Sequence, residues 1–521
     1  MMKKLLFAAF VLAVMPATAQ DTYESARLLG SDLNGTARYV GMGGAMEALG
    51  ADISTMGTNP AGIGLFRHST ASLSFGFVSQ QDAQKFDGLG KTNMSFDQAG
   101  FIYSARVGSS SYVNVGFNYH KSRNFDQILS AANALSKCSQ NGLTYYKAER
   151  GIYELDFNKQ GDVIGYEGDN RSWSYSENDY MNANVLLLDP NDEMFYTMDA
   201  NAYSFDKAHR GWIADYDFNV SGNVNDRFYW GVTVGVKDVN YKGYSEYAES
   251  LVDSKGSCGS VAVGDERKIK GSGIDMKAGI IFRPVEESPF RIGLSIATPT
   301  WYDLTSSNDS YMVNNSDYGA WDEGSSHESY DFKYYTPWKF GLSMGHTIGN
   351  QIALGLGYEY MDYSASKNRV NEDGRWYDDW YDDYYTRSHT DEPMKDNTDR
   401  SLTGQHTLKA GVEFKPVPEL AVRFGYNYLS SPYEERGVRD MTLDSPGVSY
   451  ASTTDYVNWK DTHRITCGLG VKAGGLNIDL AYQYNTTDGD FHPFQPYAGN
   501  SGVKEVSNKR HQVLLTLGYT F

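Results

Sequence analysis

The sequence predicts an all-β fold: a transmembrane β-barrel of fourteen antiparallel strands with an N-terminal segment inside its lumen. Three observations predict it. Apolar and aromatic residues recur at every second position in stretches of about ten residues, the polar connections between these stretches alternate in length, and a stretch without alternation precedes them. Period-two alternation over about ten residues is typical of a strand that faces lipid on one side only.

The N-terminus is typical of a secretory signal peptide spanning residues 1–19. Lys3 and Lys4 form a charged start, an apolar stretch follows, and Ala17-Thr18-Ala19 is a small-residue cleavage site. We expect the mature protein to begin at Gln20; the alternative is a short buried helix or membrane anchor. Beyond this stretch no run of about 20 apolar residues occurs, which excludes helical membrane spans.

Residues 69–521 are predicted to form the barrel. The last strand is the clearest, because Val513, Leu515, Leu517, Tyr519 and Phe521 share one face. The predicted strands are 69–79, 97–108, 111–120, 210–221, 226–239, 273–283, 289–298, 336–347, 350–361, 404–415, 418–429, 463–472, 475–485 and 509–521. Their number is even, as in closed bacterial barrels. The alternative is a soluble β-propeller or β-sandwich.

The connections alternate between long and short along the whole chain. Short turns such as Gly349-Asn350 separate long polar segments, of which 121–209 is the largest. This alternation predicts that the short turns and both termini lie in the periplasm, and that the long loops lie outside a Gram-negative cell. The C-terminal strand ending at Phe521 would then be presented to the barrel-assembly machinery of the outer membrane, with lipid and lipopolysaccharide around a monomer.

The two faces of the strands differ in character. Residues such as Phe228, Trp230, Val232, Leu354 and Leu356 give an apolar outward face. Charged residues fall on the other face and should line the lumen: Asp275, Lys277, Arg291, Lys339, Lys409, Glu413, Arg423, Arg464, Lys472 and Asp479. Eight glycines share that face and permit close approach of another segment: Gly231, Gly235, Gly293, Gly341, Gly355, Gly411, Gly425 and Gly468.

Residues 20–68 are predicted to form a compact hatch, or plug, because a fourteen-stranded barrel is too wide for its own side chains to fill. The alternative is a disordered periplasmic arm. The segment contains Gly35-Thr36-Ala37-Arg38, Gly41-Met42-Gly43-Gly44-Ala45 and Thr58-Asn59-Pro60-Ala61-Gly62. These residues resemble the hatch of the FadL-type outer-membrane transporters, in which the Asn-Pro-Ala element is the most recognisable sequence.

The resemblance implies passive, hatch-gated transport of hydrophobic small molecules, such as long-chain fatty acids or aromatic hydrocarbons, without a cofactor. In that family a kinked third strand opens the barrel wall sideways. The third strand predicted here has no proline, and Gly116 is its candidate weak point for lateral opening. The alternative functions are a receptor for haem or another ligand, a barrel that assembles secreted proteins at the surface, and an adhesive role.

The acidic and aromatic run from Asp373 to Asp383 falls in a predicted outer loop. Trp376, Tyr377, Trp380 and Tyr381 are its candidate ligand contacts, because aromatic faces stack on sugars or hydrophobic ligands, and the aspartates between them are candidate Ca²⁺ ligands. A solvated surface loop is the plainer interpretation. Three cysteines are too few for a disulfide framework, although Cys138 and Cys258 could pair.

No motif favours an enzyme. Gly341-Leu342-Ser343-Met344-Gly345 matches the serine-hydrolase pattern, but that pattern needs a strand-to-helix turn and Ser343 is predicted in mid-strand. The histidines form no metal-binding motif, which leaves haem ligation by His120 or His346 as an open alternative. The formal charge of -19 disfavours nucleic acid or anionic lipid as a partner.

Overall fold

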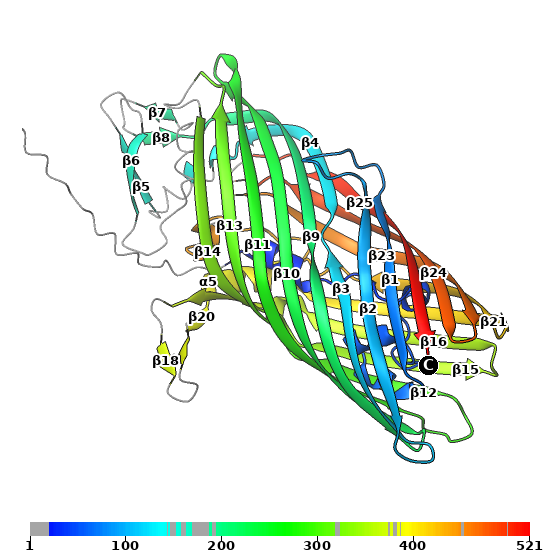
Figure 1. Cartoon of the computed structure of the whole chain (residues 1–521). Helices are drawn as coiled ribbons and strands as arrows, with labels where there is room; N and C mark the ends of the chain where they lie inside the picture. Colours follow the sequence, from blue (N-terminus) through cyan, green and yellow to red (C-terminus); the bar gives the residue numbers. More distant parts are fainter. Residues whose placement is uncertain are drawn as a thin grey trace, which may run out of the picture.

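A computed structural model describes residues 20–142, 144–145, 153–157, 163–168, 187–189, 194–317, 323–372, 376–378, 383–385, 387–449, 453–496 and 499–521. Its main sheet closes on itself because the first strand, β1 (Thr70–Gln80), pairs antiparallel with the last, β25 (Lys504–Thr520) (Figure 1). The pairing is in register from Thr70 opposite Thr520 to Gln80 opposite Arg510. The predicted closed barrel is therefore confirmed.

The barrel has fourteen strands, three of which are interrupted and carry two labels. The uninterrupted strands are β1, β2 (Thr92–Arg106), β9 (Asp199–Val224), β10 (Phe228–Asp253), β11 (Gly256–Phe282), β16 (Ile352–Asp362), β21 (Gly404–Val417), β22 (Leu420–Leu429), β23 (Tyr456–Ala473), β24 (Leu476–His492) and β25. The interrupted strands are β3 (Tyr112–Asn124) with β4 (Gln127–Cys138), β12 (Arg291–Ala297) with β13 (Trp301–Asn314), and β14 (Glu323–Tyr335) with β15 (Lys339–Ile348). Each of the fourteen predicted stretches overlaps one of them.

The predicted strands are too short on the loop side. β9, β10 and β11 have 26, 26 and 27 residues, whereas about 9–11 residues cross a bilayer. They continue, with β4, β13 and β14, as a tall curved sheet beyond the barrel (Figure 1). Parts of the long segments predicted as loops, including 121–209, are therefore strands. The apolar alternation fades there because water, and not lipid, faces the outer side of this sheet.

The outer face is apolar around the barrel, as predicted. Phe228, Val232, Leu354 and Leu356 are all exposed, between 38 and 57% of their surface. Exposed apolar side chains on every strand of a closed barrel are typical of a lipid-facing surface. Among the helices of the described residues, none has both the length and the apolar character to cross a membrane.

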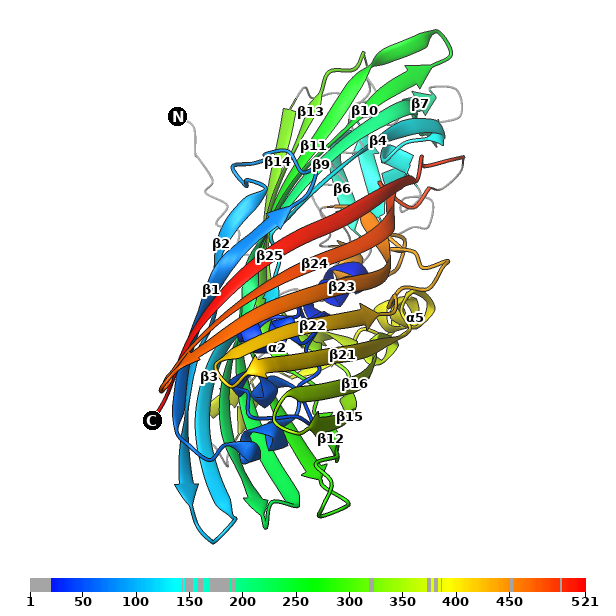
Figure 2. The ribbon, with the colours of Figure 1, turned by 90° about the vertical axis from the view of Figure 1, so that its right-hand side faces the viewer.

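Shorter elements complete the fold. They are β5 (Tyr153–Phe157), β6 (Val163–Gly168), β7 (Leu187–Asp189), β8 (Met194–Tyr196), η3 (Tyr363–Ala365), β17 (Lys367–Asn371), β18 (Trp376–Asp378), β19 (Asp383–Tyr385), β20 (Ser388–Thr390), α5 (Glu392–Ser401) and α6 (Pro446–Ser449). α5 lies at the loop end of the barrel in Figure 2.

The N-terminal segment forms four short helices inside the barrel, behind β21–β24 in Figure 2. They are α1 (Thr22–Leu29), α2 (Ala37–Gly41), η1 (Ile53–Gly57) and η2 (Pro60–Leu65). Each begins after a residue whose side-chain oxygen accepts a hydrogen bond from the first turn: Asp21, Thr36, Asp52 and Asn59 respectively. These caps satisfy amide groups that a helix this short leaves without partners.

Candidate functional site

The N-terminal segment packs against the glycines of the lumen wall. Of the eight predicted lumen glycines, six approach it: Gly231, Gly293, Gly355, Gly411, Gly425 and Gly468. A Cβ atom on Gly468 would lie 3.4 Å from the Cα atom of Gly41, and one on Gly345 would lie 3.0 Å from the Ala48 carbonyl carbon. Larger side chains at these positions would push the segment away from the wall.

The Asn59-Pro60-Ala61 element fixes one end of this segment. The Asn59 side chain accepts a hydrogen bond from the Ala61 amide at 3.1 Å and donates to the Ile280 carbonyl oxygen at 3.5 Å. Pro60 lies against Gly231, and Ala61 is buried beside Tyr229 and Ile281. The element therefore both caps η2 and joins it to strands β10 and β11.

The glycine-dense stretch is held at its backbone. Thr466 donates to the Gly41 carbonyl at 3.2 Å, and Asn427 donates to the Gly43 carbonyl at 3.2 Å. Gly43 and Gly44 have φ angles of +63° and +81°, which favour glycine. A Cβ atom on Gly43 would lie 2.8 Å from the Tyr426 amide nitrogen. Only a residue without a side chain fits there.

Buried ion pairs join the same segment to the wall. Arg38 lies 3.0 Å from Glu413, and Glu47 lies 2.6 Å from Lys409, which also contacts Glu359 at 2.8 Å. Of the wall residues, Glu413 and Lys409 are almost fully buried. Because removing one partner leaves a buried charge without compensation, such pairs fix the segment in one position.

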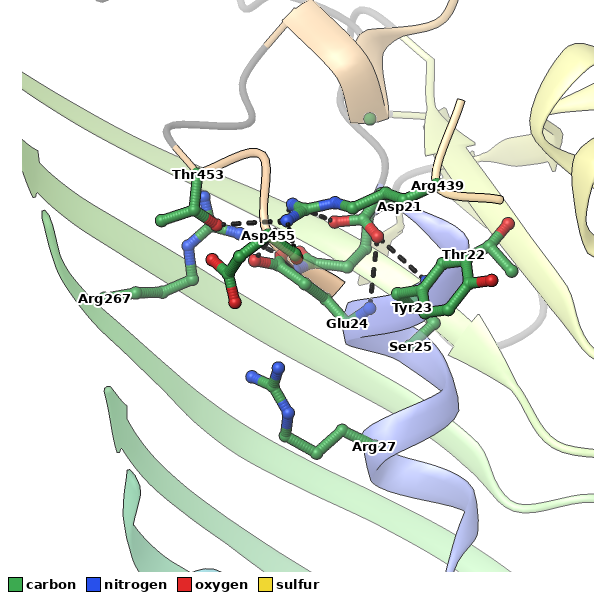
Figure 3. Close-up of polar contacts among 12 residues, drawn as sticks. Asp21, Thr22, Tyr23, Glu24, Ser25, Arg27, Arg267, Arg439, Thr453 and Asp455 are labelled. Atoms are coloured by element: carbon green, nitrogen blue, oxygen red, sulfur yellow. Dashed lines mark hydrogen bonds and ion pairs between the residues drawn. The ribbon is translucent and has the colours of Figure 1, made fainter. Parts of the chain in front are cut away.

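The segment reaches the loop end of the barrel through α1. Arg439 lies 2.8 Å from Asp21 and 3.5 Å from Glu24, and Arg267 contacts Glu24 as well (Figure 3). Burial raises the pKa of Glu24, but Arg267 and Arg439 together lower it below its ordinary value of 4.5. These contacts place Gln20 among the long loops and not on the short-turn side, where both termini were predicted. The prediction was wrong for the N-terminus because it followed only the direction of the strands.

Side chains of the outer segments cover the lumen above α1. Thr22 and Thr398 of α5 share a hydrogen bond of 2.8 Å, and the Tyr330 hydroxyl donates to Gln20 at 3.2 Å. Further out lies a hydrophobic cluster drawn from the tall sheet and the loops, which includes Leu135, Tyr203, Leu251, Met312, Met394, Met441, Phe491 and Phe494. The lumen is thus occupied by the N-terminal segment and covered by this cluster.

Two adjoining chambers remain between the N-terminal segment and the side chains that cover it. The lower has a volume of about 150 Å³ and the upper about 170 Å³, and they share Gly30, Ser31, Asp32, Tyr363 and Arg464 in their walls. Both are lined partly by the N-terminal segment and partly by the barrel strands.

The lower chamber is lined by compensated charges. Lys277 lies 2.9 Å from Asp217 and 3.1 Å from Asp275, and Lys237 lies 3.3 Å from Asp275. His120 lies 3.6 Å from Asp217 and 3.9 Å from Asp215, close enough to form a three-residue candidate metal site. Because Asp215, Asp217 and Asp275 each already pair with Lys237 or Lys277, this arrangement is a structural charge network in the wall.

The upper chamber carries excess positive charge. Its lining holds six cationic side chains, Arg27, Arg123, Arg439, Lys460, Arg464 and Arg510, against three carboxylates, Glu24, Asp32 and Asp455. Two of the cations have carboxylate partners outside the lining, since Arg439 pairs with Asp21 and Lys460 pairs with Asp490 and Glu505. Arg464 and Arg510 lie 3.9 and 4.0 Å from the same carboxylate, that of Asp32. Although burial raises the pKa of Asp32, Arg123, Arg510 and Arg464 lower it overall. Within the described residues, Nε of Arg464 has no hydrogen-bond acceptor.

Apolar groups line the rest of the upper chamber. Tyr23, Phe125, Leu129, Tyr456 and Trp459 contribute to its wall. A cavity with an apolar wall and a cluster of guanidinium groups can hold a ligand that has an apolar body and an anionic end.

The third strand breaks beside this chamber. Its pairing with β9 slips between Lys121 and Arg123, and Phe125 and Asp126 separate β3 from β4. β2 pairs with β3 only from Gln98 onward, so Thr92–Asp97 has no partner on that side among the described residues. A small cavity of about 20 Å³, lined by Asp97, Asn124, Arg510 and others, lies between the upper chamber and this part of the wall.

Gly116 lies below the break. It pairs with Ile102 on one side and Asn219 on the other, and Met56 of the N-terminal segment lies against it. β4 continues above the break on the inner side, where Ser136 and Asn500 exchange two backbone hydrogen bonds of 2.9 and 3.1 Å.

The remaining predicted residues lie elsewhere. Trp376 and Tyr377 belong to β18, while Trp380 and Tyr381 and most of the candidate Ca²⁺ run lie outside the described residues. The signal peptide also lies outside them. Ser343 is buried in mid-strand, as predicted, and Cys138, Cys258 and Cys467 are free thiols.

Sequence reasoning identified Arg464 as a lumen residue but missed its partners. Asp32 lies in an irregular stretch without periodicity, and Arg123 lies beyond the predicted end of its strand, whereas Arg510 lies inside the last predicted strand but was not assigned to the lumen. Strand alternation continued from Gln512 would have placed Arg510 in the lumen. The pairing with Asp32 depends on how the N-terminal segment folds, which alternation does not encode.

No family model and no curated protein matches the sequence. Among solved structures, the toluene transporter TbuX of Ralstonia pickettii matches 94% of this chain and 99% of its own, at 12% identity and a TM-score of 0.48. A FadL homologue of Pseudomonas aeruginosa matches over the same shares, at 12% identity and a TM-score of 0.49. The toluene transporter TodX of Pseudomonas putida matches over the same shares, at 10% identity and a TM-score of 0.46.

Proposed function

We propose that this protein is an outer-membrane transporter of the FadL type that carries hydrophobic small molecules, and that its preferred ligands have an anionic end, as long-chain fatty acids do. The upper chamber is the observation that carries this proposal. Its apolar wall suits a hydrocarbon chain. Three arginines, Arg123, Arg464 and Arg510, lie around a single carboxylate, that of Asp32. A carboxylate ligand would supply the missing negative charge.

The route follows from what blocks the lumen. The hydrophobic cluster covers the loop end of the lumen. The N-terminal segment, acting as the hatch, fills the opposite end. The break in the third strand gives a side passage from the upper chamber towards the bilayer, through the small cavity beside Asp97 and Asn124. Passive movement along this route needs neither a cofactor nor an enzyme activity.

Binding of oleate and of oleyl alcohol to purified protein tests the ligand class. Replacing Arg464 and Arg510 by Gln keeps hydrogen-bond donors but removes two charges from the chamber. A charge-assisted hydrogen bond contributes roughly 1.5–3 kcal/mol and a neutral one roughly 0.5–1.5 kcal/mol, so the two substitutions together should cost about 2–3 kcal/mol. We therefore expect oleate to bind about 30- to 100-fold more weakly and oleyl alcohol to bind unchanged. The matched control is Arg400→Gln, because Arg400 is an exposed residue of α5.

Uptake into liposomes tests the hatch. Protein lacking residues 20–68 should admit oleate and small polar solutes alike, whereas the full chain should admit oleate alone. Equal oleate affinity in the double arginine variant would contradict the ligand class. Identical flux of small polar solutes with and without residues 20–68 would contradict the hatch.

A further inference from the structure

The outer face of six neighbouring strands carries an alternating row of tyrosine and histidine. Three cross-strand pairs compose it: Tyr360 opposite His406, Tyr428 opposite His463, and Tyr484 opposite His511. The strands are β16 and β21 to β25, so the six residues follow one another around the barrel without a gap. The proposed transport makes no use of this row.

The same three-residue unit is built three times. A second tyrosine lies two positions from the first and bonds to Nδ1 of the same histidine: Tyr358 to His406 at 2.8 Å, Tyr426 to His463 at 2.7 Å, and Tyr482 to His511 at 2.8 Å. The rings of the directly opposite pairs lie 5.0–5.4 Å apart. We call these nine residues the Tyr–His row. Three copies with one geometry indicate a common role.

The row marks the upper edge of the lipid-facing band. Two positions below its histidines lie Leu408, Ile465 and Val513, exposed by 50, 59 and 44%. His511 precedes Phe521 by ten residues, which is about 33 Å along a strand and about 25 Å along the barrel axis at the usual tilt. This equals the height of the apolar band of an outer-membrane barrel, about 25 Å. The row therefore lies level with the lipid headgroups at the loop end.

Each unit has a hydrogen to donate outward. A neutral tyrosine and a neutral histidine hold one O–H and one N–H between them, and the bond between the rings uses one. The other remains for an acceptor outside, whichever tautomer the histidine adopts. The Tyr428 hydroxyl is engaged separately, since it donates to Asp461 at 2.8 Å. Hydrocarbon offers no acceptor, whereas lipid phosphates offer strong ones.

We propose that the Tyr–His row is a docking surface for the phosphate groups of outer-leaflet lipids. The protein's formal charge of -19 opposes anionic lipid in general. The row fits phosphate nevertheless, because it is continuous with the lipid-facing surface and its own nine side chains are neutral donors, Asp461 being already engaged by Tyr428. The proposal rests on the membrane location given above, but not on the identity of the transported ligand.

Native mass spectrometry of the full-length protein with diphosphoryl lipid A and with the same lipid freed of phosphate tests the proposal. One variant changes a single unit, Tyr426→Phe with His463→Phe, which keeps both rings. A second changes the bonded pair of every unit to phenylalanine, at Tyr358, Tyr426, Tyr482, His406, His463 and His511. The matched control is Tyr311→Phe with His327→Phe, since both side chains are exposed on the tall sheet, away from the row.

We expect the unaltered protein and the control to retain the diphosphoryl lipid preferentially. The single-unit variant should lose about fivefold of this preference, as expected for one hydrogen bond, and the larger variant should lose most of it. Equal retention of both lipids by the unaltered protein, or an unchanged preference in the single-unit variant, would overturn the proposal. Oleate binding should not change in any of these variants, so failure here is distinct from failure of the transport function.

Discussion

Replacing Lys409 by methionine should release the hatch. Lys409 is 6% exposed and lies 2.6 Å from Glu47 of the N-terminal segment. At that distance and an effective dielectric constant of about 20, the attraction is about 6 kcal/mol before the cost of desolvation. Truncating one partner of a buried pair costs about 3–5 kcal/mol net. Methionine fills the volume of the lysine stem without its charge, so Glu47 and Glu359 would face each other without the ammonium group that pairs with both.

The expected result is a leaky barrel. A loss of about 3–5 kcal/mol raises the undocked fraction of the hatch by about 10²- to 10³-fold, since each 1.4 kcal/mol is a factor of ten. Conductance of the purified protein in planar bilayers measures this as more frequent open events. Adding Glu47→Gln to the variant removes one of the two stranded carboxylates and should restore part of the closure.

Lys395→Met is the matched control. Lys395 pairs with Asp399 on the surface of α5, and an exposed pair of this spacing contributes only about 0.3–0.5 kcal/mol. Open events in this control should be as rare as in the unaltered protein. The reasoning fails if Lys409→Met, folded as judged by its heat-modifiable migration in gels, opens no more often than Lys395→Met.

Three further changes probe the same segment and wall. Gly43→Ala should increase leakage, because φ is +63° and its Cβ atom would meet the Tyr426 amide at 2.8 Å, whereas Gly349→Ala, with φ of +56° and open space around it, should not. Gln80→Leu should speed amide hydrogen exchange in β4, because it removes two hydrogen bonds of 2.7 and 2.8 Å to the Ile128 backbone; unchanged exchange would contradict this. The pKa of Glu24 is lower in the folded protein than its ordinary 4.5, so its stabilisation of α1 is present above pH 4.5 and lost as the pH falls towards 2; hydrogen exchange of α1 should show this loss, and Glu24→Gln should abolish it.

The barrel was predictable because lipid imposes a simple rule on each strand. Alternation placed Lys277, Lys409 and Glu413 in the lumen and Val232 and Leu354 outside, and the structure agrees at each position. Where the outer side faces water the rule weakens, and the predicted strand ends were too short there by up to about seventeen residues. The bends at Pro299 and Pro337 follow from the missing amide of proline, although the sequence reasoning did not use them.

The site was less predictable because its parts come from unrelated stretches. The lumen glycines predicted close approach of another segment, and the structure places residues 20–68 against six of them. The pairing of Arg439, in a loop, with Asp21, before a helix, depends on the fold of both and on no local pattern. The break in the third strand was sought at Gly116, the most flexible residue. The structure has its interruption at Lys121–Asp126 instead, where a register slip turns Phe125 into the core beside Ile213.

α1 connects the N-terminal segment that occupies the lumen with the outer segments that cover it. Its first turn bonds to α5 and, through Arg439, to the loop before β23, while the chain that follows it lines both chambers. A ligand that displaced α5 or the Arg439 loop would therefore remove the hydrogen bonds and ion pairs that hold the start of the hatch. Because Asp32 lies in the same connected segment and faces Arg464 and Arg510, an anionic ligand in the upper chamber would compete with it for those arginines. In the proposed transport, opening from outside and ligand binding inside would both act on one short stretch, residues 21–32, and this stretch would couple capture to movement of the hatch.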